Sequence, residues 1–299
     1  MKNINITLPD GSKKSAPIGS TAMDIATQIG PGLAKAALVA KINGELRDLN
    51  FKINEDCNIE LLTGDNPEGH SVLLHSAAHL LAQAVKHYWP NAKLTIGPAI
   101  DNRFYYDFDL DITFSDEDLV KLESRMMQLS KKNFPCVRCE LTRSEAYNKF
   151  KEMGEDYKLE ILNDIKDDEL ITSYTQGDFI DLCRGPHVPS TGSIKYFKLL
   201  NTSGAYWRGN ENNKMLQRIY GTAWATEKEL AAYLHMLEEA EKRDHRTGAA
   251  SRRQAPRGRG GAAVFHEPDA GPPGLQPSEC RGSDRDRRQA ARDRRHPEH

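Results

Sequence analysis

The chain has 299 residues, of which 38% are apolar and 28% are charged, and its formal net charge is −2. This length allows two or three compact domains with cores of their own. It contains no run of 18 apolar residues, and its first seven residues alternate instead of forming an apolar leader, so neither a membrane span nor a signal peptide is expected. Five scattered cysteines make a disulfide framework unexpected and predict a cytoplasmic location.

The composition changes abruptly near residue 246. Residues 1–245 carry 29 basic and 36 acidic side chains, whereas residues 246–299 carry 12 arginines, no lysine and 7 acidic side chains. The second segment also lacks Ile, Asn, Tyr, Met and Trp, so it cannot bury enough apolar surface to offset chain ordering. We therefore predict a disordered, Arg-rich tail over 247–299. A basic arm for nucleic acid and a frameshifted reading of the gene remain open as alternatives.

Residues 1–63 predict a small domain of the β-grasp, ubiquitin-like plan. Strands are expected at 2–8 and 13–17 around an Asp-Gly turn, at 38–42 and 45–49 around an Asn-Gly turn, and at 59–63. Thr21 and Asp24 resemble a capping box, which predicts a helix that ends near Ile29. Residues 64–69 are expected to form a linker.

Residues 64–225 predict an α/β domain, so the fold class of the whole chain is α+β. Helices are expected at about 71–88, 116–132 and 144–153 from the spacing of their apolar residues. Strands are expected within 94–109, 137–141 and 194–220, with Gly204–Gly209 in a turn. A second capping box at Thr226 and Glu229 predicts a linker helix over 226–246.

Two pairs of residues carry the chemistry. His75 and His79 are four apart on a predicted helix and therefore share one face, and Cys183 and His187 are four apart on a predicted loop. These residue types match the number and kind of ligands of a tetrahedral zinc ion. A metalloprotease of the HExxH type is excluded because position 76 is serine. A nucleophilic Cys183 with His187 or His75 as base remains open.

A further pair, Cys136 and Cys139, is weaker as a signal. A single Cys-x-x-Cys without a second pair is poor support for zinc or redox chemistry, and both cysteines fall on a predicted strand. We expect a structural role for this pair.

Several segments resemble threonyl-tRNA synthetases. Residues 6–12 and 29–36 are similar to the TGS domain of these enzymes. Their editing domain is similar to residues 75–81, 96–98, 104–107, 181–187 and 204–209, and residues 213–224 and 242–246 continue the likeness. The resemblance covers about residues 3–246 and implies a TGS domain over 1–63 followed by an editing domain over 64–225.

The resemblance also implies an activity. A full-length member uses ATP to join threonine to its tRNA, and its catalytic domain, with a catalytic zinc ion, would begin beyond Arg246. We therefore expect a monomer without ligase activity that hydrolyses mischarged seryl-tRNA(Thr) at the tRNA 3′ end. Such editing is needed because one methyl group gives a binding pocket only about 10–200-fold discrimination. A non-catalytic tRNA-binding fragment and a zinc-binding module are the alternatives.

The residues implied for this reaction fall into two sets. The catalytic set is His75, His79, Lys158, Asp181, Cys183 and His187, in which Lys158 and Asp181 rest on the resemblance alone. The family implies an ordered water instead of a metal, although the three histidines and the cysteine favour zinc as residue types. Contacts to RNA are expected from Tyr206, Trp207, Arg208, Lys214 and Arg218.

Overall fold

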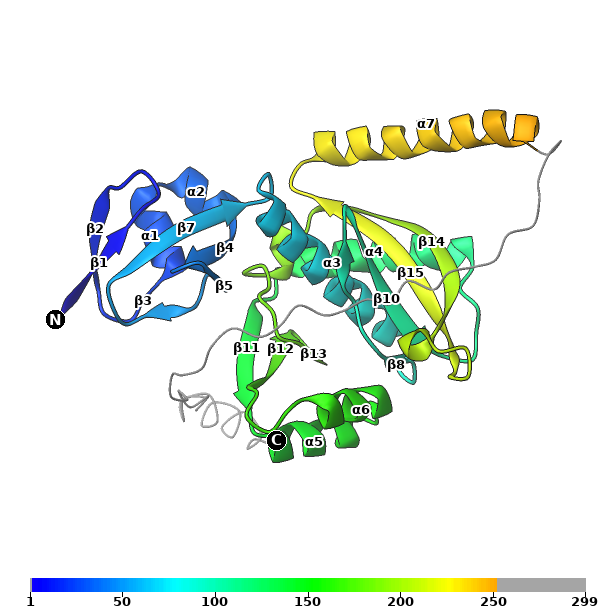
Figure 1. Cartoon of the computed structure of the whole chain (residues 1–299), viewed down its shortest axis with the longest axis horizontal. Coiled ribbons are helices and arrows are strands. Elements are labelled where there is room, and N and C mark those ends of the chain that lie inside the picture. Colours follow the sequence, from blue (N-terminus) through cyan, green and yellow to red (C-terminus); the bar gives the residue numbers. More distant parts are fainter. Residues whose placement is uncertain (1, 252–299) are drawn as a thin grey trace, which may run out of the picture. The chain divides into compact units, whose positions relative to one another are not determined.

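A computed structural model describes residues 2–251 of the chain (Figure 1). The chain divides into a compact unit of residues 1–245 and a second unit of residues 246–299. Helix α7 (Glu227–Ser251) continues five residues beyond the end at residue 246 that the sequence predicts. The helix can extend there because Ala249 and Ala250 favour helix and no proline occurs before Pro256. The remainder of the predicted tail, 252–299, lies outside the described residues.

The first 63 residues form a β-grasp domain. The sheet order is β2-β1-β7-β4-β5, in which β1 and β7 are parallel and the other neighbouring strands are antiparallel. The strands are β1 (Asn3–Thr7), β2 (Lys13–Pro17), β4 (Ala37–Ile42), β5 (Glu45–Arg47) and β7 (Cys57–Thr63), and a separate ladder pairs β3 (Ser20–Thr21) with β6 (Lys52–Ile53). Helix α1 (Ala22–Ile29) packs on this sheet and begins with the predicted capping box.

A second short helix in this domain was not predicted. Helix α2 (Pro31–Ala36) begins directly after the Gly30 that ends α1. The sequence Gly30-Pro31-Gly32 indicates a stop, but proline is also well suited to the first turn of a helix, where its missing N–H has no partner to lose. The same three residues therefore end one helix and begin the next.

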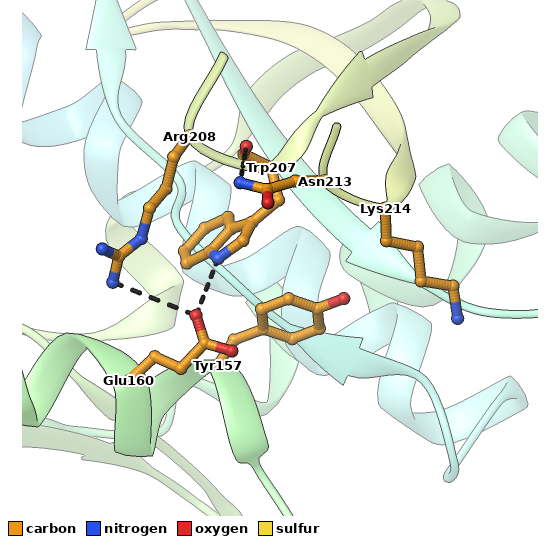
Figure 2. Close-up of a pocket in the computed structure, with 6 residues that line it drawn as sticks. All are labelled: Tyr157, Glu160, Trp207, Arg208, Asn213 and Lys214. Carbon is orange, nitrogen blue, oxygen red and sulfur yellow. Dashed lines mark hydrogen bonds and ion pairs between the residues drawn. The ribbon is translucent and has the colours of Figure 1, made fainter. Parts of the chain in front are cut away.

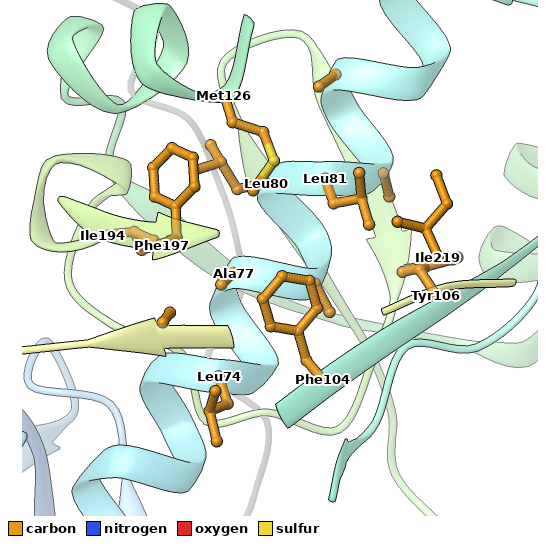
Figure 3. Packing of buried hydrophobic residues seen from close by; sticks show 14 of the residues in the cluster. Leu74, Ala77, Leu80, Leu81, Phe104, Tyr106, Met126, Ile194, Phe197 and Ile219 are labelled. Atoms are coloured by element: carbon orange, nitrogen blue, oxygen red, sulfur yellow. The ribbon is translucent and has the colours of Figure 1, made fainter. Parts of the chain in front are cut away.

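Helix α3 (Pro67–Tyr88) is the central element of the following domain. It begins four residues earlier than predicted because the Asn66 side chain accepts hydrogen bonds from the backbone of Glu68 and Gly69, with Pro67 in the first turn. Residues 67–69 therefore belong to the helix and not to a linker. Most of the helix is buried, and Figure 3 shows Leu74, Ala77, Leu80 and Leu81 packed among side chains of the neighbouring sheet and helix.

The partners of α3 are a sheet and helix α4 (Asp116–Lys132). The sheet has the order β14-β15-β10-β8, with β9 pairing β10, and Figure 1 shows α3 running alongside it. Its strands are β8 (Lys93–Leu94), β9 (Ala99–Ile100), β10 (Arg103–Asp109), β14 (Tyr196–Tyr206) and β15 (Met215–Trp224). Gly204–Tyr206 lie in β14 instead of in the predicted turn, because they pair with Met215–Gln217 across a long hairpin.

A smaller sheet has the order β11-β12-β13. It consists of β11 (Cys136–Leu141), β12 (Ile171–Gln176) and β13 (Phe179–Leu182), and helices α5 (Arg143–Glu152) and α6 (Asp156–Asp164) connect β11 to β12. Helix α6 was not predicted. Cys136 and Cys139 lie three apart on β11 and so point to opposite faces, which prevents them from binding one ion together.

Within residues 2–251, no helix combines the length and the apolar character needed to cross a bilayer.

Candidate active site

The two predicted pairs of residues meet at one point of the second domain. Helix α3 presents His75 and His79 on one face, and the loop after β13 carries Cys183 and His187. The Sγ atom of Cys183 lies 3.0 Å from Nε2 of His75 and 3.3 Å from Nε2 of His187. His79 and His187 are buried, whereas His75 and Cys183 are half-buried, so the cluster meets solvent on the side of these two residues.

The hydrogen bonds of the imidazoles define their tautomers. His75 Nδ1 lies 3.0 Å from the Gly97 carbonyl oxygen, which can only accept, so the ring proton is on Nδ1. Ser76 donates its hydroxyl proton to the Val72 carbonyl oxygen, so its Oγ accepts from Nδ1 of His187 at 3.0 Å. Both rings therefore turn an Nε2 lone pair toward Cys183. One thiol can donate only one proton, so a second donor or a cation is needed to satisfy both lone pairs.

Burial controls the protonation of this cluster. It lowers the pKa of His75, and it lowers the pKa of His79 and of His187 well below the ordinary value, helped by the neighbouring imidazoles. The same burial raises the pKa of the Cys183 thiol to about 12. The hydrogen bond from the backbone N–H of Gly185 to the sulfur acts in the opposite direction and lowers this pKa. At neutral pH the cluster therefore holds neutral imidazoles and a protonated thiol. A thiolate nucleophile is disfavoured by this environment.

A buried ion pair borders the imidazoles. Lys158 on α6 lies 2.5 Å from Oδ1 of Asp181 on β13, and both side chains are almost fully buried. Lys158 also donates to the Thr95 carbonyl oxygen at 2.6 Å and to the Tyr106 hydroxyl at 3.2 Å, while Tyr106 donates to Oδ2 of Asp181 at 2.6 Å. Nε2 of His79 lies 3.6 Å from the same Oδ2 atom. Ring contacts of His79 with His75 and His187, at 5.0 and 4.3 Å between ring centres, link this network to the rest of the cluster.

The four side chains His75, His79, Cys183 and His187 offer the donor atoms of a metal site. The ligand atoms of His75, His79, Cys183 and His187 lie within 4.8 Å of one another. In a tetrahedral zinc site with Zn–N of about 2.0–2.1 Å and Zn–S of about 2.3 Å, ligand atoms are roughly 3.3–3.6 Å apart. The two distances from Cys183, 3.0 and 3.3 Å, are close to this spacing. The Nδ1–H bonds to Gly97 and Ser76 also resemble the outer contacts of zinc-bound imidazoles. The residues therefore fit a zinc ion.

Three residues that hold this cluster in place, Tyr106, Ser76 and Gly97, were not predicted from the sequence. Tyr106 lies in an aromatic run of β10 whose neighbours Phe104 and Phe108 are also fully buried, so its hydroxyl is the one polar group among three core rings. Ser76 bears on the sequence prediction only because a serine at this position excludes an HExxH metalloprotease. Gly97 contributes only its backbone carbonyl. Tyr106 could have been found, since a buried tyrosine needs a partner for its hydroxyl. The other two leave no pattern in the sequence.

The five residues predicted to bind RNA lie around the hairpin of β14 and β15, and most have partners within the chain. Arg218 makes a two-pronged ion pair with Asp107 at 2.6 and 2.7 Å, and its guanidinium lies 3.7 Å from the ring centre of Tyr105. Trp207 is buried, whereas Tyr206 is exposed. The geometry therefore gives Arg218 and Trp207 a structural role at this hairpin.

Three of the five, Trp207, Arg208 and Lys214, line a cavity of about 380 Å³ (Figure 2). Its other lining residues are Tyr157, Glu160 and Asn213. Within it the Trp207 indole donates to Glu160, and next to it Arg208 pairs with Asp164 and Lys214 with Asp109. Arg208 and Lys214 are exposed, so their charges can reach a ligand only in competition with these carboxylates.

Comparison with known proteins gives matches to both parts of the chain. Residues 4–63 match the TGS domain, and residues 171–220 match the threonyl and alanyl tRNA synthetase second additional domain. A threonine–tRNA ligase of Pelobacter propionicus is 56% identical over 246 residues, and one of Hahella chejuensis is 55% identical over 241 residues. These alignments cover 82% and 81% of this chain but 38% of each relative.

Proposed function

The chain belongs to the threonyl-tRNA synthetase family over 82% of its length, and we propose that it carries the editing activity that hydrolyses seryl-tRNA(Thr). The convergence of two Nε2 lone pairs on Cys183, at the half-buried side of the cluster, is the observation that supports this proposal most directly. The chain spans about two fifths of the length of these relatives, so ligation of threonine is not part of the proposal.

The proposed reaction uses a water molecule held by the imidazoles. This water donates one proton to Nε2 of His75 or His187, and its oxygen attacks the carbonyl carbon of the ester. The bond between that carbon and the ribose oxygen then breaks, the ribose oxygen takes the proton back from the imidazole, and serine leaves as the free amino acid. Because burial keeps both rings neutral at pH 7, each is able to accept the proton.

The buried ion pair has a different role in the proposal. Asp181 is the carboxylate beside the imidazoles, so it is suited to hold the hydroxyl or ammonium protons of the serine moiety. Lys158 compensates the charge of Asp181 and supplies positive potential where negative charge develops on the ester oxygen. Tyr106 stays protonated, because burial and the charge of Asp181 raise its pKa well above the ordinary value, and its hydroxyl orients the carboxylate.

A second candidate, zinc binding, is favoured by the fit of the four ligand atoms. A zinc ion held by His75, His79, Cys183 and His187 would supply Lewis-acid chemistry. Four protein ligands would close the coordination sphere, however, and a hydrolytic zinc keeps one position open. The water-based reaction is therefore the first proposal. Zinc analysis after dialysis discriminates the two, since one retained equivalent would favour the zinc module.

The decisive experiment follows amino acid release from the two charged tRNAs. The purified chain should release serine from seryl-tRNA(Thr) and leave threonyl-tRNA(Thr) near its uncatalysed rate. His75→Ala should slow serine release by about 10²–10⁴-fold, the range for losing a positioned base. His87→Ala is the matched control, because His87 lies on the same helix but is exposed. Circular dichroism of each variant tests that the helix is intact.

Two results would contradict the proposal. In the first, the wild-type protein binds the tRNA but releases serine no faster than the uncatalysed rate. The chain would then be a tRNA-binding fragment without catalytic activity. Full activity in His75→Ala would remove that imidazole from the reaction.

We also propose a partner for the chain and a place in the cell. The tRNA 3′ end is the partner, as for other members of the family, and Arg208 and Lys214 at the cavity of Figure 2 are the cations proposed to meet its phosphates. We place the chain in the cytoplasm as a monomer. The location rests on the odd number and scattered positions of the cysteines in the sequence.

A further inference from the structure

A carboxylate of the β-grasp domain lies against the loop that carries Cys183 and His187. Asp48 follows strand β5, and its Oδ1 atom accepts the backbone N–H of His187 at 2.9 Å. Its Oδ2 atom accepts the hydroxyl of Tyr174, a buried residue of β12, at 2.7 Å. One side chain from the first domain thus binds two groups that border the cluster of the second domain.

Asp48 is itself held firmly by its own domain. The next residue, Leu49, is fully buried in the β-grasp core, and its carbonyl oxygen accepts from the backbone N–H of Met23 in α1. The carbonyl oxygen of Asp48 accepts from the N–H of Phe51, which closes a turn. The carboxylate therefore projects from a rigid position, and ordering it costs little side-chain entropy.

Tyr174 extends the contact to the rest of the loop. Its ring centre lies 4.4 Å from that of His187. Its hydroxyl also lies against Gly185, where an added Cβ would be only 2.0 Å from the hydroxyl oxygen. Gly185 has a φ of +73° and donates its N–H to Cys183 Sγ. The hydroxyl that Asp48 orients thus contacts the residue midway between Cys183 and His187.

The electrostatics agree with a positional role. Burial raises the pKa of Asp48, while the hydrogen bonds from His187 and Tyr174 and the charge of Arg138 oppose this shift. A partly buried carboxylate is costly unless it is hydrogen-bonded, and here each oxygen has one strong donor. Removing the carboxylate would leave the His187 N–H without its acceptor at the base of the loop.

We propose that Asp48 is a positioning residue of the editing site, supplied by the TGS domain, which fixes the Cys183–His187 loop so that both sulfur and imidazole face His75. The effect of Asp48 on editing rests on the proposed function, whereas its effect on the position of the Cys183–His187 loop does not. The inference assigns the TGS domain a direct part in shaping the hydrolytic centre.

The test uses two measurements on Asp48→Ala and Asp48→Asn. The first is alkylation of Cys183 by iodoacetamide at fixed pH, followed by mass spectrometry, with Cys139 as an internal reference. Loosening of the loop in Asp48→Ala should speed alkylation of Cys183 at least about 10-fold, as expected for losing a hydrogen bond to a charged group. The second is serine release, which should fall about 10–100-fold, the usual effect of losing such a supporting contact.

The conservative variant and a matched control separate positioning from folding. Asparagine keeps an oxygen for the His187 N–H and an amide that can donate to the Tyr174 hydroxyl, so Asp48→Asn should restore most of both properties. Asp56→Ala is the control, because Asp56 makes the same kind of paired bonds, but to Asn5 within the β-grasp domain. It should change neither measurement.

The outcomes are distinguishable. Unchanged alkylation of Cys183 in Asp48→Ala would overturn the inference, whatever the activity. If the wild type releases no serine, the proposed function is contradicted but the role of Asp48 is not. Faster alkylation of Cys183 in Asp48→Ala would then still support Asp48 as the anchor of the loop. If Asp48→Ala does not fold, Tyr174→Phe provides the test, because it removes one of the two bonds and should give a smaller increase in alkylation. Wild-type alkylation in that folded variant would overturn the inference.

Discussion

At the scale of single residues, the state of each group in the candidate site is decided by its neighbours. His75 and His187 are alike as residue types, yet each is oriented by a different acceptor, a backbone carbonyl for one and a serine hydroxyl for the other. Lys158 and Asp181 are both ionisable and buried, and each makes the burial of the other tolerable.

The buried ion pair should affect both stability and activity. Lys158→Ala should lower the free energy of unfolding by about 3–5 kcal/mol, since it leaves Asp181 buried without compensation. The double variant Lys158→Met with Asp181→Leu should recover most of this stability, because neither charge of this pair is then left buried without the other. Serine release should stay lost in both. Urea denaturation and the deacylation assay measure the two effects, and a double variant as unstable as Lys158→Ala would contradict the argument.

Stability should also depend on pH. The pKa of His79 and of His187 is well below 6.5 in the folded chain, so the unfolded chain binds more protons once the pH falls below 6.5. The free energy of unfolding should therefore decrease as the pH falls from 7.5 to 5.5, by up to about 1.4 kcal/mol per pH unit for each ring that stays neutral.

This pH dependence is measured by urea denaturation in the presence of EDTA. His187→Gln removes one of the two imidazoles and should show a shallower dependence than the wild type. Equal slopes in the two proteins would show that His187 does not carry the effect.

At the scale of elements, α3 is the helix that both domains use. Its first turn packs on the end of β7. Its later turns, from Val72 to Val85, carry side chains that complete the core of the second domain. Gly69 lets the helix lie close against the end of the strand, because a Cβ there would lie 2.1 Å from the carbonyl oxygen of Thr63. A side chain at this position would meet backbone, which cannot rotate away.

Gly69→Ala should therefore destabilise the chain, by about 1–3 kcal/mol, as expected when a packed site is overfilled. Gly32→Ala is the matched control. Gly32 also lies in a helix, α2, but an added Cβ would meet nothing within 4 Å, so alanine should stabilise the chain by roughly 0.5–1 kcal/mol. Thermal or urea denaturation of both variants gives the comparison. A Gly69→Ala protein as stable as the wild type would mean that β7 and α3 can move apart.

At the scale of the whole molecule, the described part of the first unit shares one hydrophobic cluster across its two domains. Leu38, Val39 and Leu62 from the β-grasp strands belong to the same buried cluster as the residues of α3 and its sheet. The β-grasp domain has a second cluster of its own around Ile6 and Ile59. The shared cluster and the contacts of Asp48 both predict that the two domains unfold together.

Leu62→Ala tests this coupling. It should lower hydrogen-exchange protection by about 2–5 kcal/mol both at amides of the β-grasp sheet and at amides of α3, since the cavity lies in the shared cluster. Ile25→Ala, in the separate β-grasp cluster, provides the comparison. Protection that falls in the β-grasp sheet alone would show that the domains open independently.

Local sequence was sufficient for many of the elements, although not for α2 and α6, and for the His and Cys residues of the candidate site. Capping boxes, Asp-Gly and Asn-Gly turns and apolar periodicity act within a few residues, so α1, α4 and the β-grasp hairpins follow from them. Two pairs of residues, His75 with His79 and Cys183 with His187, are each four apart in the sequence. This spacing predicts that the members of each pair lie close together, because it is a property of one helical face or one short loop.

Tertiary structure decided what those residues can do. The tautomers of His75 and His187 depend on Gly97 and Ser76, the compensation of Lys158 depends on a strand 23 residues later, and the loop is anchored by Asp48, 139 residues before His187. Such contacts join segments that carry no common local signal, since any carbonyl, hydroxyl or carboxylate at the right place would serve. Burial has the same origin: only the packed chain excludes the water that would otherwise keep these imidazoles titrating near their ordinary pKa.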